Sequence, residues 1–128
     1  MQDSGKIEEA VQTIGEALRI YNNKAILYMD RGILYSTQKN YAKAVADFTT
    51  VIKLEPNQCE GYFNRGRCYL RWKKAALAVA DLEKSNSFHD PEYTGGYAML
   101  GEAHTMLGRP DLAKKDYELS RKYSDALF

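Results

Sequence analysis

The sequence predicts an all-α protein, an α-solenoid of antiparallel helix pairs with about seven helices. The main observation is internal repetition. The segment DRGILYSTQKNYAKAVADF, which begins at Asp30, is matched 34 residues later by NRGRCYLRWKKAALAVADL, which begins at Asn64. The second observation is that apolar residues recur at helical spacing within each period, without the alternation of a half-buried strand. Repeats of this length bury their apolar faces by stacking on their neighbours.

Sets of equivalent residues fix the register of the repeat. They are Ala10, Ala44, Ala78 and Ala113; Gly32, Gly66 and Gly101; Tyr28, Tyr62 and Tyr97; and Ile14, Phe48, Leu82 and Tyr117. The last step in these sets contains one extra residue, which falls between Ser85 and Tyr93. An inserted residue costs least in a loop, so we expect a loop in that segment.

The register divides the chain into four parts. Residues 1–24 are predicted to be the second helix of a truncated repeat, because Gly5, Ile7 and Ala10 occupy the places of the inter-helix turn and the second helix. Three further repeats, each with two helices, are expected over residues 25–58, 59–93 and 94–128.

Breaks in the pattern mark the ends of the helices. In the first complete repeat the helical spacing is interrupted at Lys39 and Asn40 and stops before Pro56. Later in the chain, Asp90 and Pro91 predict a turn followed by a helix start, and the pair Gly95-Gly96 opens a helix.

The three glycines in register need a physical reason, because a glycine inside a helix costs about 1 kcal/mol relative to alanine. We expect them to allow close approach of the two helices of a repeat. The small residue expected opposite each glycine is an alanine of the second helix. The expected pairs are Ala44 with Gly32, Ala78 with Gly66, and Ala113 with Gly101.

This pattern resembles the tetratricopeptide-repeat family over nearly the whole chain. The family places a bulky, a small and an aromatic residue in the first helix, then an alanine, an aromatic residue, a small residue and a proline. The best match is Tyr28, Gly32, Tyr35, Ala44, Phe48, Val51 and Pro56. The resemblance implies a right-handed superhelix whose first helices line a concave groove for peptides or partner helices.

Two arginines depart from the family pattern, which usually has leucine before the packing glycine. Leu100 obeys the pattern, whereas Arg31 and Arg65 do not. Each of those repeats carries an aspartate in its second helix, and we predict the pairs Arg31–Asp47 and Arg65–Asp81. A bidentate pair would make a half-buried arginine tolerable. The alternative is that these arginines grip a ligand.

The ends of the chain lack the polar caps that solenoids need for solubility. Tyr117, Leu119 and Tyr123 form the last predicted helix, and no polar helix follows it. We therefore expect a fragment of a longer array, with end-to-end self-association through the uncapped repeats.

The groove face can be assigned by helical offset within the first helices. The candidate binding residues are Met29, Asp30, Ile33, Phe63, Asn64, Arg67, Arg71, Met99 and Glu102. Phenylalanine and methionine offer an adaptable apolar strip. Arg67 and Arg71 offer charge-assisted hydrogen bonds to an acidic group, and Asn64 can pair with a ligand's backbone amide.

Some members of the family bind the acidic tails of heat-shock chaperones through a two-carboxylate clamp. Such a clamp needs lysine, asparagine and arginine at set places in three consecutive first helices. Only Asn64 fits here, because the corresponding basic places hold Met29, Gly95 and Met99. We therefore do not expect chaperone-tail binding.

Nothing in the sequence predicts an enzyme, a metal site or a cofactor. His104 stands where Tyr35 and Tyr69 stand in their repeats, which makes it a core substitution, and a nucleophile pair with Cys68 is a remote alternative. His89 lies in a loop with no evident partner. Cys59 and Cys68 are too far apart on one helix to bridge, so we expect reduced thiols in the cytoplasm or nucleus.

Charge argues against nucleic acid and membrane surfaces as partners. Eighteen basic and seventeen acidic residues give a net charge of +1. One basic cluster near Trp72 has aromatic neighbours, as in some RNA-binding proteins, but it includes Arg71, Lys73 and Lys74 at a helix end, where positive charge is favourable. No segment is long and apolar enough for a membrane span.

The predicted function is a protein-interaction module that binds a peptide or helix of a partner protein in its groove, without a small-molecule ligand. Two alternatives stay open. One is a structural spacer of a larger repeat protein, and the other is a regulatory domain of an enzyme not included in this chain.

Overall fold

The computed structural model describes residues 4–126 and divides the chain into two compact units, residues 1–57 and 58–128. Over the described residues it contains seven α-helices and one short 3₁₀-helix, η1, and no strand. In the first unit the helices are α1 (Ser4–Ile20), α2 (Ala25–Thr37) and α3 (Tyr41–Leu54). In the second they are α4 (Glu60–Arg71), α5 (Ala75–Asn86), η1 (Pro91–Tyr93), α6 (Gly96–Met106) and α7 (Pro110–Ala126). The predicted all-α class and helix number are confirmed.

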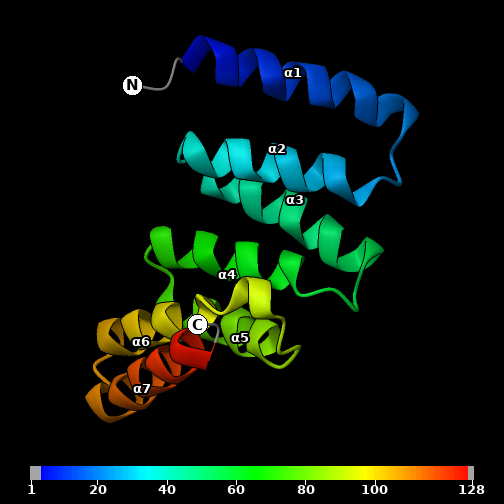
Figure 1. The fold of residues 1–128 in the computed structure, drawn as a ribbon. Coiled ribbons are helices and arrows are strands. Elements are labelled where there is room, and N and C mark those ends of the chain that lie inside the picture. The colour runs from blue at the N-terminus through cyan, green and yellow to red at the C-terminus, as the bar shows by residue number, and fades with distance from the viewer. Residues whose placement is uncertain (1–3, 127–128) are drawn as a thin grey trace. The chain divides into compact units, whose positions relative to one another are not determined.

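Within each unit, consecutive helices pack side by side and run antiparallel (Figure 1). In the first unit α2 packs on both α1 and α3. In the second unit α4 packs on α5, α5 on α6, and α6 on α7. Helix α1 begins at Ser4, so Gly5 lies in its first turn and not in an inter-helix turn as expected.

The turn between the two helices of a repeat has the same backbone geometry each time. Lys39, Lys73 and Gly108 are equivalent by register, and each has a positive φ, of 61°, 62° and 70°. The next residue closes each turn through its N–H, as Asn40 does with a 2.8 Å bond to the carbonyl of Tyr35. A left-handed residue after a helix, with a backbone bond of this span, is a standard way to stop a helix.

The glycines do allow close approach, but the expected alanine partners were wrong. A Cβ placed on Gly32 would lie 2.6 Å from the ring of Phe48. Gly66 and Gly101 meet the side chains of Leu82 and Tyr117 in the same way. The residue that contacts each glycine is therefore the large side chain four positions after the alanine of the second helix. It fits against the first helix because the glycine has no side chain there. The alanines are buried beside it.

Both predicted arginine–aspartate pairs are present. Arg31 donates from Nε and Nη2 to Asp47 at 2.8 and 2.7 Å, and Arg65 makes the same two bonds to Asp81 at 2.7 and 2.8 Å. These aspartates are buried. The pairs join the two helices of a repeat, which favours a structural role for the arginines over ligand binding.

The second unit has a core of small and branched residues. It is built from Leu70, Ala75, Ala78, Leu82, Leu100 and Ala103. In contrast, Leu112 and Tyr117 of α7 are each 42% exposed. End-to-end association through such residues stays a prediction.

Candidate functional site

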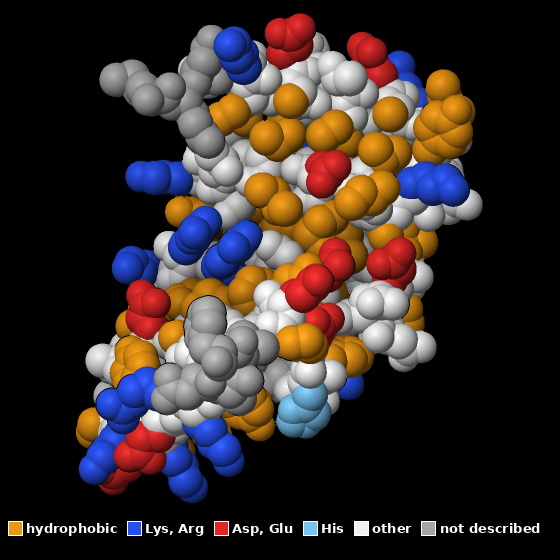
Figure 2. Space-filling model, viewed as in Figure 1, with side chains coloured by type: hydrophobic (Ala, Val, Ile, Leu, Met, Phe, Trp, Pro, Cys, Tyr) orange, Lys and Arg blue, Asp and Glu red, His pale blue; other side chains and the backbone are white. Residues whose placement is uncertain are grey.

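The nine predicted groove residues divide between the two units, and each unit is described by itself. In the first unit, Met29, Asp30 and Ile33 lie on α2. Met29 is buried, whereas Asp30 and Ile33 are exposed. Figure 2 shows apolar side chains in a band over α1 and α2, and Ile26 of α2 is exposed. The first unit therefore offers apolar contact area beside one carboxylate.

An aromatic pair forms the centre of the site in the second unit. Phe63 of α4 meets Tyr93 of η1 edge to face, with ring centroids 5.0 Å apart. Gly95 lies against the same ring, because a Cβ at Gly95 would sit 3.7 Å from Phe63 Cζ. Phe63 is half-buried. Its ring is fixed by η1 and by the start of α6, which makes it a rigid apolar contact.

Arg67 lies next to this ring, and its position is fixed by a hydrogen bond to the buried Asn64. Its guanidinium carbon is 5.7 Å from the centroid of Phe63, and its Nη2 donates to Asn64 Oδ1 at 2.8 Å. Asn64 Nδ2 donates in turn to the carbonyl of Glu60 at 2.9 Å. Asn64 is 7% exposed. Both ends of its amide are used inside the protein, so Asn64 positions Arg67 and has little surface for a ligand.

The charge of Arg67 is not neutralised within the described part of the chain. No carboxylate there forms an ion pair with it. Burial, and then the neighbouring charge of Arg71, lower the pKa of Arg67 from its ordinary value. Removing a cation from water is costly unless a partner compensates. Arg67 is therefore a half-buried cation that an anionic group would stabilise.

Glu60 forms no ion pair with Arg67 in the described part of the chain, and its carboxylate is hydrogen-bonded to Tyr93. Burial raises the pKa of Tyr93 to about 12, and the charge and hydrogen bond of Glu60 add to the rise. The phenol therefore stays protonated and can donate to the carboxylate.

The remaining predicted residues of the second unit lie on α4 and α6. Arg71 at the end of α4 and Glu102 on α6 are exposed. Met99 of α6 is half-buried and packs against the core of the unit. The arrangement therefore combines an aromatic ring, a methionine and two arginines, which can bind a peptide that carries an acidic group beside an apolar side chain.

Two features of the second unit were missed by sequence reasoning. The first is Tyr93, which was assigned only to a loop. The second is the hydrogen bond between Nδ1 of the buried His104 and Oδ2 of Asp116, at 2.5 Å. Asp116 follows Asp47 and Asp81 in the repeat register, while the arginine position holds Leu100. The sequence did contain a signal for this contact, because the last repeat keeps the aspartate but lacks the arginine that pairs with it in the other repeats.

Other chemistry is sparse in the described residues. Cys59 and Cys68 are both buried, and neither forms a disulfide in the described part of the chain. Burial, and then the charge of Asp90, raise the pKa of Cys59 to about 11, which keeps this thiol unreactive. Over residues 4–126, no three His, Cys, Asp or Glu side chains are grouped to hold a metal ion.

Two further observations concern the charges over the last two helices and the possibility of a membrane span. Over α6 and α7, acidic side chains lie among the basic ones on the visible face (Figure 2). None of the described helices has the length and apolarity needed to cross a membrane.

Comparison with known families and structures agrees with the repeat pattern. Two models of the tetratricopeptide repeat match residues 25–58 and 60–87. A crystal structure of MamA superposes with a TM-score of 0.86 at 18% identity, covering 96% of this chain and 75% of that chain. This likeness shows the fold.

Two similar structures contain a bound peptide. The first tetratricopeptide domain of Spaghetti (RPAP3), bound to the HSP90 peptide SRMEEVD, is 30% identical with a TM-score of 0.71. The match covers 81% of this chain and 93% of that domain. The second domain of the same protein, with the same peptide, is 28% identical with a TM-score of 0.73, and the match covers 84% and 98%.

Proposed function

Because this chain belongs to the tetratricopeptide-repeat family, we propose that it is a non-catalytic protein-interaction module that binds an acidic segment of a partner protein. Such repeats are typically binding modules without catalysis. The proposed binding face consists of the first helices of the repeats, with the repeats at residues 25–58, 59–93 and 94–128. We place the module in the cytoplasm, where its two thiols stay reduced.

The observation that carries this proposal is the state of Arg67. It is a half-buried cation beside a fixed aromatic ring, and the described residues give it no carboxylate. A carboxylate of a partner would pair with Arg67, and an adjacent apolar side chain would cover Phe63. Charge-assisted bonds of this kind are about twice as strong as neutral ones.

The peptide-bound relatives support an acidic ligand but not the same mode of binding. SRMEEVD carries two glutamates and an aspartate, so the RPAP3 domains accept an acidic peptide. In this chain the basic places of the two-carboxylate clamp hold Met29, Gly95 and Met99. We propose that this surface binds one carboxylate through Arg67, together with apolar neighbours, and not a chain-terminal carboxylate pair.

The test is a pull-down that compares the wild type with a variant carrying both Phe63→Ala and Arg67→Ala. Partners of this surface should be lost, because removing the cation of a charge-assisted pair costs about 2–5 kcal/mol. Binding should also weaken as salt is raised. The exposed Lys53→Ala variant serves as the control. If the double variant retains every partner, the binding surface has been misassigned. If the wild type itself captures no partner, the chain is a structural spacer.

A further inference from the structure

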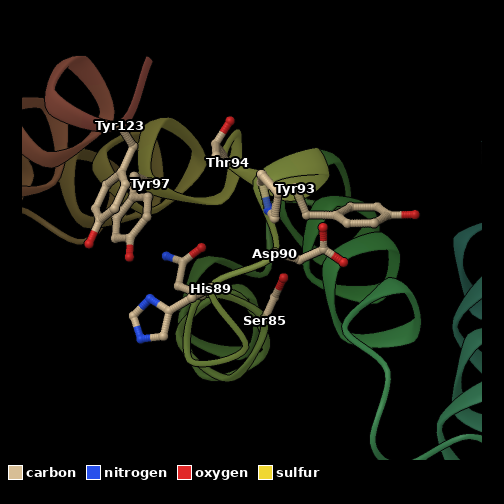
Figure 3. Close-up of a pocket in the computed structure, with 9 residues that line it drawn as sticks. Ser85, His89, Asp90, Tyr93, Thr94, Tyr97 and Tyr123 are labelled. Carbon is tan, nitrogen blue, oxygen red and sulfur yellow. The ribbon is translucent and has the colours of Figure 1, made fainter. Parts of the chain in front are cut away.

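Two concavities of the second unit differ in size and in lining. The smaller, of about 120 Å³, is shown in Figure 3, where Tyr97 and Tyr123 lie side by side with ring centroids 4.8 Å apart. The Asn86 amide beside it packs against Gly96 and does not face it. The larger, of about 370 Å³, lies between the turn that joins α4 to α5, the first turn of α5 and the end of α6. We call it the turn hollow, and its lining residues are Lys73, Lys74, Ala75, Ala76, Leu77, Met106 and Leu107.

Three large apolar side chains line the turn hollow and are open to water. Leu77 is 51% exposed, Met106 41% and Leu107 37%. Single apolar residues on a surface are ordinary, but several around one concavity are typical of a binding site. None of the three belongs to the core of the unit, so the packing of its helices does not account for their apolar character.

The corresponding hollow of the first unit is mostly polar. It has a volume of about 440 Å³ and lies between α1, the end of α2 and the start of α3. By register, Glu8 stands there in the place of Ala76, and Gln38 in the place of Leu107. Met106 has Thr37 as its equivalent in the first complete repeat. The exposed apolar residues are therefore a property of the turn hollow and not a requirement of the repeat.

Two lysines give the turn hollow a positive rim. Lys74 Nζ lies 4.7 Å from the ring centroid of Trp72, and that ring stacks on the ring of Tyr69. Tyr69 packs against the core of the unit, so the position of this cation is fixed by aromatic contacts. Neither Lys73 nor Lys74 forms an ion pair with a carboxylate of residues 4–126, and the lining contains no acidic residue. The hollow is therefore complementary to anionic groups that flank apolar side chains.

From these features we propose that the turn hollow binds an acidic amphipathic helix of a partner protein through two apolar side chains. A cavity of about 150 Å³ holds benzene, so a hollow of about 370 Å³ has room for two such side chains. Residues three or four apart on a helix lie about 5–6 Å from each other on one face. Acidic residues beside them would reach Lys73 and Lys74, while the flexible Met106 adapts to the shape of the bound side chains.

This surface is separate from the one proposed above for peptides. Phe63, Arg67 and Tyr93 do not line the turn hollow. Binding here therefore does not depend on the proposed function, although both surfaces select acidic partners.

The shape of the surface favours a protein partner over a membrane. Exposed apolar residues with neighbouring lysines also occur on proteins that bind anionic bilayers, where the apolar side chains are buried in the lipid. Side chains that enter lipid must protrude from the protein. In the turn hollow they line a concavity, which instead accepts side chains of a partner.

The test is a nuclear magnetic resonance titration with a synthetic helix of about fifteen residues. The helix carries two leucines four positions apart among glutamates and alanines. The ¹⁵N-labelled chain carries Phe63→Ala and Arg67→Ala, so that the proposed peptide surface does not bind the same probe. The backbone amide signals of Ala76, Leu77 and Leu107 should shift, and the affinity should fall as salt is raised.

Two matched probes separate the apolar from the charged contribution. One has lysines in place of the glutamates, and the other has alanines in place of the leucines. Each should bind at least about tenfold more weakly than the acidic helix with leucines. The wild type should show the same shifts at the turn hollow as the variant with Phe63→Ala and Arg67→Ala.

A double variant tests the apolar contacts. Met106→Thr with Leu107→Gln introduces the residues that the first complete repeat has at these positions. Binding should weaken at least about tenfold, and the melting temperature should stay unchanged because both side chains are exposed. The control is Leu54→Gln, at a leucine of the first unit that is 40% exposed, and it should leave binding intact.

A second double variant tests the charges. Lys73→Gln with Lys74→Gln should weaken binding of the acidic helix and reduce its dependence on salt. Lys122→Gln, at an exposed lysine of α7, is the matched control and should change neither.

The proposal fails if the acidic helix does not bind, if the leucine-free or basic probe binds as tightly, or if the variant with Met106→Thr and Leu107→Gln binds like the wild type. A response that disappears with Phe63→Ala and Arg67→Ala would place the helix on the peptide surface and overturn the separate site. Vesicles that contain phosphatidylserine test the membrane alternative, and their binding without binding of the helix would overturn the protein partner. Failure of the pull-down with an intact titration would refute only the proposed function.

Discussion

Removal of the carboxylate of Asp81 is the sharpest test of how the repeats are held together. Asp81 accepts two bonds from Arg65, at 2.7 and 2.8 Å, and its side chain is 7% exposed against 21% for the arginine. In Asp81→Ala, the guanidinium loses the carboxylate that accepts these two bonds, while most of the arginine side chain stays out of water. The free energy of unfolding should therefore fall.

The size of the loss follows from the burial of the two groups. Removing one partner of a fully buried ion pair costs about 3–5 kcal/mol. The exposed fifth of Arg65 lets water solvate part of the charge, so we expect about 2–3 kcal/mol. At this chain length that corresponds to a decrease of roughly 8–12 °C in melting temperature.

A double-mutant cycle separates loss of the pair from loss of packing. Arg65→Leu introduces the residue type that stands at the equivalent position 100, where the repeat carries no arginine. The variant with both Arg65→Leu and Asp81→Ala should recover stability relative to Asp81→Ala, with a coupling energy of about 2 kcal/mol. Urea and thermal unfolding followed by circular dichroism measure each variant.

The control is Arg71→Ala, at an exposed arginine of the same helix, which should change stability by less than about 0.5 kcal/mol. An unchanged melting temperature for Asp81→Ala would refute the structural role of the pair. Strictly additive effects in the cycle would show that the two side chains do not stabilise each other.

Two further predictions concern a packing contact and a buried thiol. Gly32→Ala should lower the free energy of unfolding by about 1–3 kcal/mol, because the new Cβ would lie 2.6 Å from the ring of Phe48. The control is Gly15→Ala, where the nearest neighbour of the new Cβ would be 4.0 Å away; this variant should raise the free energy of unfolding by about 0.5–1 kcal/mol. Equal effects in urea unfolding would contradict the packing argument. Because the pKa of Cys59 is raised to about 11, the unfolded thiol ionises first, and stability should fall from about pH 9 to pH 11. In Cys59→Ala, the free energy of unfolding should fall by about 2–3 kcal/mol less over this pH range. If this variant loses stability with pH as steeply as the wild type, the role of the thiol is refuted.

Much of the fold could be predicted from the sequence because each repeat restates the same local pattern. The period of 34 residues fixes the order of helices and turns, and the extra residue before Tyr93 marked the loop that the structure shows there. The pairs Arg31–Asp47 and Arg65–Asp81 followed from residues that recur together at one spacing. Regular helices place equivalent residues in equivalent surroundings, so recurrence in sequence becomes recurrence in space.

Contacts that depend on side-chain direction and on irregular segments needed the tertiary structure. The glycines predicted a close approach, but the crossing of the helices decided that Phe48 and not Ala44 faces Gly32. The sequence placed Arg67 and Phe63 on one helix face, and only the path of η1 brought Tyr93 against that ring.

The sequence by itself determined the helices and their pairing, since these depend on periodic positions along a regular helix. The tertiary structure decided that Arg67 is a half-buried cation and that the buried Asn64 supports it from within. These properties depend on which groups surround an atom in three dimensions. Burial and hydrogen-bond satisfaction arise from several elements at once, and a one-dimensional pattern does not contain them.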